Sequence, residues 1–280
     1  MRGWHFAFNR RWFGYLGAAL AFALACVLLS QWQFARRDEA VVEINRVIDN
    51  YEAPPVPLAA ALPQLDDFDE DDKWLPVTLK GEYLVESQVL ARNRPYNGNP
   101  GFEVLTPLLL TDGTVFIVDR GWLPSGTKDY PDAVPEPPAG QVTVIARLKA
   151  GEPALAGRSA PDGQVATVEL PLIADLVDRP AYTGAYGLLA SETPSVADMP
   201  LPAVKPAPDE GPHLSYAVQW IVFALFGFFG LGYALRQEYR LVNADDPEER
   251  ARAAIRREKA SRRKRTDSDI EDELLDASSG

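Results

Sequence analysis

Residues 12–35 read WFGYLGAALAFALACVLLSQWQFA, which is 24 consecutive positions without a charged side chain. Residues 214–235 read LSYAVQWIVFALFGFFGLGYAL, a second uncharged run of 22 positions. A helix needs roughly 20 mostly apolar residues to cross the hydrocarbon of a bilayer, because it rises about 1.5 Å per residue and must satisfy its own backbone hydrogen bonds there. The two runs therefore predict transmembrane helices at 12–35 and 214–235.

The first run also has two alternative interpretations as a processed segment. A secretory signal core is about 7–15 residues long and ends at a small-residue cleavage site, whereas this run is longer. Cys26 follows Ala-Leu-Ala and so loosely suggests a lipoprotein site, but Ala23 stands where leucine is usual and the apolar run continues to Trp32. We expect an uncleaved span, with Trp12 and Trp32 near its ends, where aromatic rings favour the headgroup zone.

Lys and Arg residues near the two runs predict the orientation of the chain. Arginines follow the second run at 236, 240, 250, 252 and 256, whereas Lys205 is the only Lys or Arg in the twenty residues before it. Excess positive charge stays on the cytoplasmic side, so both termini are expected there. The predicted parts are a cytoplasmic N-terminus (1–11), an extracytoplasmic domain (36–213) and a charged cytoplasmic tail (236–280). Without an Arg- and Ser-rich transit peptide, we expect the plasma (cell) membrane of a bacterium.

The outer region reads as a β-rich domain. Residues 36–52 keep helical spacing, so the first span is expected to continue as one helix until the prolines at 54, 55 and 57. Short runs rich in branched and aromatic residues follow from Trp74, and Asp112-Gly113 between two of them predicts a hairpin. We expect a strand at 164–170 (QVATVEL), a short helix at 172–177, a strand near 182–189 and an extended return at 193–212. The predicted fold is a membrane protein with two transmembrane helices flanking a mainly antiparallel β extracytoplasmic domain, a small barrel or sandwich with a few helices.

Composition argues against several function classes. Residues 38–213 carry 28 acidic and 12 basic side chains, a poor match to nucleic acid. Residues 66–72 hold six carboxylates, but they lack EF-hand spacing, so a solvated loop is favoured over a calcium site. The tail, basic at 250–265 and acidic at 267–276, is read as solvated rather than as nucleic-acid binding. The outer domain has no Cys, a single His and no Gly-rich phosphate loop, so it is not expected to be an enzyme.

Three segments resemble one known family, the Surfeit locus protein family of cytochrome c oxidase assembly factors. Residues 30–36, SQWQFAR, resemble its WQ-x-x-R motif at the outer end of the first span. Residues 101–107, GFEVLTP, and 118–124, VDRGWLP, resemble its central strand block, with Asp119 where Asn is usual. Residues 213–220, HLSYAVQW, resemble its His-x-x-Tyr-Ala-x-x-Trp motif at the second span. The ordered set is specific and covers residues 28–235.

The resemblance implies a role in the biogenesis of haem-copper terminal oxidases, around insertion of haem a into the catalytic subunit. The expected partners are that subunit and the lipid bilayer. His213 is the candidate axial ligand for haem iron and the one candidate metal ligand, with Trp32 and Tyr216 beside the macrocycle. Arg94, Arg120 and Arg36 are candidates for pairing with the haem carboxylates.

Other interpretations of the same residues remain open. His213 and Tyr216 lie one helical turn apart and could only anchor the helix at the interface, as could Trp32. Gly121 is expected to supply an unusual backbone angle where Arg120-Gly121-Trp122 ends a strand at a turn. At the level of function, the alternatives are an extracytoplasmic ligand-sensing membrane protein and a permanent accessory subunit of a respiratory complex.

Overall fold

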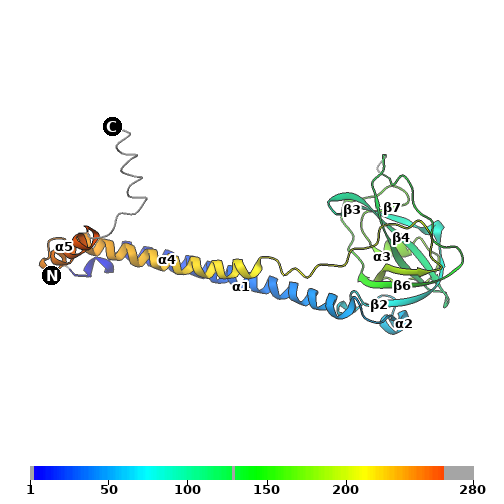
Figure 1. Ribbon diagram of the computed structural model, residues 1–280, viewed down its shortest axis with the longest axis horizontal. Helices are drawn as coiled ribbons and strands as arrows, with labels where there is room; N and C mark the ends of the chain where they lie inside the picture. The colour runs from blue at the N-terminus through cyan, green and yellow to red at the C-terminus, as the bar shows by residue number, and fades with distance from the viewer. Residues whose placement is uncertain (1–2, 128–129, 262–280) are drawn as a thin grey trace. The chain divides into compact units, whose positions relative to one another are not determined.

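The computed structural model describes residues 3–127 and 130–261, and it divides into two compact units. One unit holds the described residues up to Arg37 and from Gly211 onward, and it is helical. The other unit, residues 38–210, holds all of the described strands. Figure 1 shows the helices of the first unit in blue, yellow and orange, and the strands in cyan to yellow-green.

The helical unit is built on two long helices. It consists of η1 (His5–Phe8), the first part of α1 (Arg10–Asn50), α4 (His213–Val242) and α5 (Pro247–Ser261). Both α1 and α4 are long and apolar enough to cross a membrane. Each predicted span lies wholly inside one of them. The start of the basic tail is helical, since α5 reaches Ser261, and the acidic segment 267–276 lies outside the described residues.

Small side chains bring α1 and α4 together as an antiparallel pair. Ser30 on α1 is 4% exposed and Ala217 on α4 is fully buried. The hydroxyl of Ser30 donates to the carbonyl oxygen of Ala217 over 3.0 Å. At the other end of the pair, Arg11 forms an ion pair with Glu238. Small residues at such contacts let two backbones approach closely, which is how helices associate in an apolar medium.

Five strands of the second unit close a small barrel. They are β2 (Pro76–Tyr83), β6 (Gln141–Ala150), β8 (Ala185–Thr193), β5 (Val115–Pro124) and β4 (Asn99–Leu110). Each strand pairs with the next in this order, and β4 pairs with β2 to complete the ring. All five pairs are antiparallel except β5 with β8. The predicted mainly antiparallel β domain is therefore confirmed, and it is a barrel.

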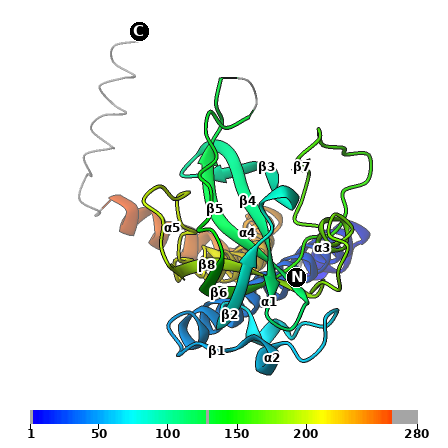
Figure 2. The same cartoon turned by 90° about the vertical axis from the view of Figure 1, so that its right-hand side faces the viewer.

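Three further strands and several short helices surround the barrel (Figure 2). The strands are β1 (Val56–Pro57), β3 (Val89–Tyr96) and β7 (Gln164–Val165); the helices are α2 (Leu58–Ala61), η2 (Glu70–Asp72), η3 (Val85–Ser87) and α3 (Leu170–Ala174). β3 lies antiparallel to β4 and parallel to β7, and β1 lies parallel to β2. The hairpin predicted at Asp112-Gly113 is confirmed, because β4 and β5 flank it as an antiparallel pair.

Gly81 makes the closure of the barrel possible. It pairs with Val142 on one side of β2 and with Leu110 on the other. A Cβ atom at Gly81 would lie 2.1 Å from the carbonyl oxygen of Leu109. A glycine within a strand commonly marks such a close approach of two backbones, and any side chain here would push β4 away from β2.

Alternating side chains fill the barrel. In β6, residues 142, 144, 146 and 148 are buried and the residues between them are not, which is the period of two of a half-buried strand. Nine of the ten residues of β5 are buried, because other segments cover its second face. Each fully buried Leu, Val, Ile or Phe contributes roughly 1.5–3 kcal/mol relative to exposure, so this core is the main source of the barrel's stability.

The C-terminal part of α1 belongs to the barrel unit. Val47 and Tyr51 are buried in one of its core clusters. Glu43 accepts a hydrogen bond from the indole of Trp74 over 2.9 Å and pairs with Lys73 over 2.8 Å. The predicted continuation of the first span as one helix is confirmed to Asn50, within two residues of the expected end.

Three predictions for smaller elements were wrong in their bounds. The helix expected at 172–177 is α3, which begins at Leu170 because Pro171 suits the first helical turn. The strand expected near 182–189 is β8, which begins at Ala185. The run QVATVEL forms only the two-residue strand β7, since the chain then turns into α3.

Candidate functional site

His213 is the first residue of α4, and Gln33 on α1 orients its ring. The Nδ1 atom of His213 lies 2.8 Å from Oε1 of Gln33, and both side chains belong to the helical unit. An amide oxygen only accepts hydrogen bonds, so Nδ1 carries the proton in this contact. The unprotonated Nε2 of a neutral ring then keeps its lone pair, which is the state that a metal-binding histidine requires.

Two aromatic residues accompany His213 in the helical unit. Trp32 precedes Gln33 on α1 and is 56% exposed, and Tyr216 lies one turn after His213 and is 47% exposed. Their exposed rings agree with contact to a ligand and equally with anchoring at a membrane interface. The structure therefore brings together His213 with Gln33, and it keeps Trp32 and Tyr216 in the same unit as that pair.

Arg94 and Arg120 lie in the barrel unit, and both are engaged by groups of the barrel. Arg120 is 1% exposed; its Nη1 donates to the carbonyl oxygen of Pro135 over 2.8 Å, and its Nη2 lies 3.6 Å from Oε1 of Glu192. The other oxygen of Glu192 accepts from the hydroxyl of Tyr83 over 2.9 Å. The guanidinium of Arg120 thus offsets the charge of a buried carboxylate.

Arg94 joins two carboxylates of the barrel unit, Glu103 and Glu152. Its Nε lies 2.9 Å from Glu103 and its Nη2 lies 2.7 Å from Glu152, which also accepts from the backbone N–H of Val168 over 3.1 Å. Burial works against ionisation of Glu152, but the hydrogen bonds from Arg94 and Val168 outweigh it and hold the pKa of Glu152 below its usual value. Both arginines therefore have a structural role in the described residues.

The motif at 118–124 runs through β5 as a bulged strand. The expectation that Arg120-Gly121-Trp122 ends a strand at a turn was wrong, because β5 continues to Pro124 with a register shift opposite residues 103–105. Gly121 has φ +127°, which confirms the unusual backbone angle, and a Cβ there would lie 2.4 Å from the carbonyl oxygen of Leu201. Only glycine fits both the angle and the close approach.

Asp119 is the buried acid of this bulge. It is 3% exposed, and its Oδ1 accepts from the backbone N–H of Gly121 over 2.9 Å. Burial, followed by the nearby charge of Glu103, raises the pKa of Asp119 to about 8. Burial likewise raises the pKa of Glu103, although Arg94 opposes the shift. Asp119 therefore carries a proton at neutral pH and resembles the amide that is usual at this position.

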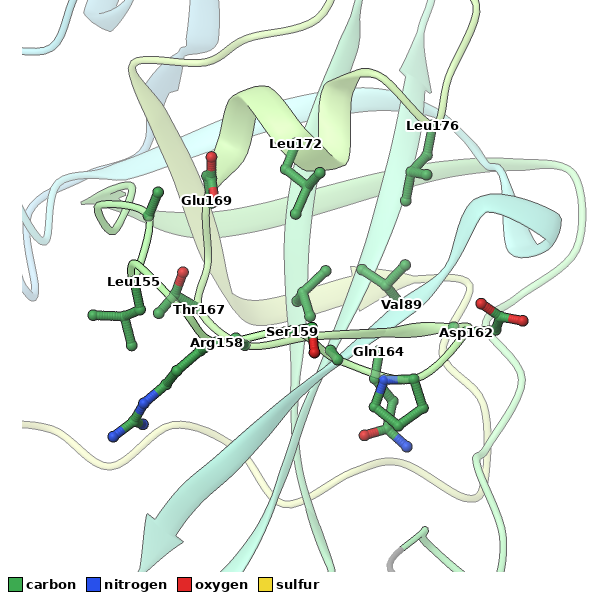
Figure 3. A pocket seen from close by; sticks show the side chains of 16 residues that line it. Val89, Leu155, Arg158, Ser159, Asp162, Gln164, Thr167, Glu169, Leu172 and Leu176 are labelled. Atoms are coloured by element: carbon green, nitrogen blue, oxygen red, sulfur yellow. The ribbon is translucent and has the colours of Figure 1, made fainter.

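Several cavities open on the barrel unit. One, of about 320 Å³, is lined by Glu103, Asp119 and Lys149 together with the rings of Trp74, Tyr96 and Trp122. Another, of about 490 Å³, lies between α3 and the segment 154–167. In Figure 3, Leu172 of α3 and Leu176, which follows that helix, extend toward Val89, and the guanidinium of Arg158 points away from them. No His or Cys is among the residues that line these two cavities. His213 therefore stays the candidate for an imidazole ligand.

Sequence reasoning missed the partners that give these side chains their roles. Gln33 lies inside a quoted motif, but its contact with His213 spans 180 positions and leaves no periodic signal. Glu192 and Glu152 pair with Arg120 and Arg94 across 72 and 58 positions respectively. Within residues 3–127 and 130–261, no group of three His, Cys, Asp or Glu side chains could hold a metal ion. A metal at His213 would therefore need ligands beyond these side chains.

Comparison with known proteins identifies relatives over most of the chain. Residues 20–225 match the SURF1 family. Uncharacterized SURF1-like proteins of Mycobacterium bovis and Mycobacterium tuberculosis are 35% identical to this chain over 236 residues, which cover 81% of this chain and 85% of each relative. A SURF1-like protein of Dictyostelium discoideum is 31% identical over 105 residues, covering 36% of this chain and 39% of that protein. The family resemblance predicted from the three motifs is confirmed.

Proposed function

This chain belongs to the SURF1 family, and we propose that it is an integral membrane assembly factor for a haem-copper terminal oxidase. In this proposal it contacts the catalytic subunit transiently and assists the insertion of haem a. The family is one of oxidase assembly factors, and its members are not typical enzymes. The observation that carries the proposal is the pair Gln33–His213, in which two family motifs meet and orient one imidazole.

The proposed placement has α1 and α4 crossing a bacterial plasma membrane, with the barrel outside and both termini in the cytoplasm. Two observations support it. Both helices are long and apolar enough to span a bilayer, and they pair antiparallel as a hairpin of two spans requires. The arginines at 236, 240, 250, 252 and 256 follow α4's apolar stretch, as expected for a cytoplasmic end. The His213 end of α4 then lies at the outer interface.

The residues of the helical unit fit one axial contact to haem. Gln33 holds the Nδ1 proton of His213, so Nε2 is the atom that would meet iron, and haem iron commonly takes such a neutral imidazole. Trp32 and Tyr216 offer exposed rings to the macrocycle. Haem a, when bound, is the group delivered to the oxidase; the chain's own residues bind and orient it at the membrane surface.

The haem carboxylates need a cation, and the helical unit offers Arg36. Arg36 lies three residues after Gln33 on α1, in the same unit as His213. Arg94 and Arg120 were also predicted for this role, and each is already paired with carboxylates of the barrel. Arg36 also has a partner within the chain. The proposal gives the propionate contact to Arg36 first because, of the three arginines, it is the one in the same unit as His213.

A deletion strain that makes haem a tests the proposal. The chain is restored as wild type, as His213→Ala or as His5→Ala, which removes the other histidine as a matched control. We expect oxidase activity with wild type and His5→Ala, and a loss with His213→Ala. A Soret band should co-purify with the first two forms and be absent from the third.

The other outcomes separate the rival functions. Normal oxidase activity in the deletion strain would contradict the assembly role altogether. Failed assembly with no haem on the wild-type chain would leave a chaperone of the catalytic subunit and remove haem carriage. A chain that purifies in equal stoichiometry with the mature oxidase would instead be an accessory subunit.

A further inference from the structure

A second candidate site lies at the other end of α4, away from His213. A cavity of about 420 Å³ is bounded by α4, by α5 and by Trp4. Four arginines line it: Arg236 and Arg240 from α4, Arg252 and Arg256 from α5. We call it the arginine pocket. Its volume falls within the roughly 300–1,000 Å³ of typical ligand sites.

The helix geometry aims two pairs of guanidinium groups at one space. Arg236 and Arg240 are four residues apart, and so are Arg252 and Arg256, so each pair lies on one face of its helix. Like charges at this spacing repel each other and destabilise the helix that carries them. An anion between the two faces would relieve both repulsions.

The charges of the pocket are only partly neutralised. Its one acidic residue is Glu249, which is 6% exposed and lies 2.6 Å from Nη2 of Arg256 and 3.8 Å from Nη1 of Arg252. Among the residues that the structure describes, Arg236 and Arg240 have no carboxylate partner. Arg252 also lies 3.5 Å from the exposed carboxylate of Glu248, outside the pocket. Arg236 and Arg240 therefore bring two uncompensated positive charges to the pocket.

The pocket sits where the apolar part of α4 ends. Leu235 is the last residue of the uncharged run, and Arg236 follows it directly. The ring of Trp4 stacks on Tyr239 with 4.5 Å between centroids and is 51% exposed. Tryptophan and tyrosine at such a boundary are typical of the headgroup zone of a bilayer. A phospholipid could therefore keep its chains along α4 and its phosphate among the arginines.

We propose that the arginine pocket binds the phosphate of an anionic phospholipid headgroup in the cytoplasmic leaflet. Guanidinium forks pair with phosphate oxygens through two parallel hydrogen bonds, which lysine cannot reproduce. Basic pockets between helices on the cytoplasmic side commonly hold such headgroups. This inference rests on the membrane placement proposed above. Nucleic acid is disfavoured, because the cavity adjoins an apolar helix.

The test compares two double variants of the full-length chain, purified in mild detergent. Arg236→Gln with Arg240→Gln removes two pocket charges. Arg250→Gln with Arg257→Gln removes two charges from exposed positions of α5 that do not line the pocket. Each protein is incubated with nanodiscs of phosphatidylcholine alone or of phosphatidylcholine with cardiolipin, and retained cardiolipin is counted by native mass spectrometry. Alkaline carbonate extraction of cell membranes reports separately whether the chain is integral.

We expect the pocket variant to retain about tenfold less cardiolipin than wild type, since two charge-assisted hydrogen-bonding groups are lost, and the control variant to stay near wild type. Glu249→Gln should raise retention by leaving Arg252 and Arg256 for the lipid. An equal loss in both double variants would overturn the inference in favour of general surface charge. The inference would also be overturned if millimolar inorganic phosphate displaced cardiolipin from the wild-type chain while the pocket variant retained as much cardiolipin as wild type. A chain that carbonate removes from membranes would instead overturn the membrane placement.

Discussion

Both units of the molecule bury polar side chains, but they satisfy them by different means. Where the apolar stretches of α1 and α4 meet, the polar contacts are neutral and single: Ser30 donates to one carbonyl, and Gln33 holds one ring nitrogen of His213. In the barrel they are charged and networked, as in Arg120 with Glu192 and Tyr83. An ion in hydrocarbon is costly, whereas a barrel wall supplies several strands of hydrogen-bonding groups around it.

The difference teaches which arginines and histidines are available for function. Arg120 is surrounded by groups that depend on it, so removing it leaves Glu192 buried without its cation. His213 is held by one neighbour and is half-buried, so the fold depends on it little. Charged residues in family motifs can thus maintain the fold, and neutral residues beside them can carry the chemistry.

The largest effect should come from breaking the barrel's charge network. Arg120→Met is expected to lower the free energy of unfolding by about 3–5 kcal/mol, because an unpaired carboxylate stays buried. Thermal unfolding of the full-length chain in detergent, followed by tryptophan fluorescence, measures it. Exposed Arg158→Met is the control and should be nearly neutral. Adding Glu192→Gln to Arg120→Met should recover part of the loss; no recovery would show that the pair is not the cause.

A smaller effect should follow pH through Asp119. Its folded pKa of about 8 exceeds the ordinary 3.8, so the folded chain binds a proton that the unfolded chain releases. Its stabilising contribution is fully present below about pH 4 and is lost as the pH rises through 8. Since one pKa unit corresponds to about 1.4 kcal/mol, Asp119→Asn should gain a few kcal/mol over wild type at pH 9 and nothing at pH 4.

Asp112→Asn is the matched control for this pH dependence. Hydrogen bonds from the side chain and backbone of Thr114 hold the pKa of Asp112 below its usual value, so its contribution has the opposite sign. It is present above the ordinary pKa and lost as the pH falls through the folded one. Identical stability-against-pH curves for Asp119→Asn and wild type would contradict the buried, protonated state of Asp119.

In the helical unit, a substitution beside His213 should change the amount of haem that the chain retains more than it changes folding stability. Gln33→Ala is expected to reduce haem retained by the purified chain by about 10–100-fold, because partners that orient a metal ligand typically contribute that much. Gln31→Ala, two positions away in the same motif and exposed, should retain haem normally. The ratio of Soret absorbance to protein measures both. Equal haem retention in the two variants would show that Gln33 only joins the two helices and does not orient a haem ligand.

The smallest effect is expected at the neutral helix contact. Ser30→Ala should weaken the helix pair by about 0.6 kcal/mol, the average for hydrogen bonds between membrane helices. Unfolding in mixed micelles with increasing dodecyl sulfate measures the change, with exposed Ser215→Ala as the control. If Ser30→Ala lowered the free energy of unfolding as much as Arg120→Met does, the proposed difference between neutral helix contacts and the charged barrel network would be contradicted.

Much of the fold was predictable, and the failures have a common cause. The two long helices and the hairpin at Asp112-Gly113 follow from local patterns, and both are confirmed. The bulge at Gly121 was placed at a strand end, because a sequence pattern carries the special backbone angle but not the partner strand that continues beside it. The candidate site was found only as separate motifs, since pairing across 180 positions has no period to detect.

The sequence by itself determined the apolar helices, the β-rich middle and the family. These depend on run length, periodicity and short motifs, which are properties of neighbouring residues. Only the tertiary structure decided that Gln33 meets His213, that Arg120 neutralises Glu192, and that four arginines surround one cavity. Each of these joins residues from different elements, and a side chain's role is set by the charge and burial that those distant neighbours impose.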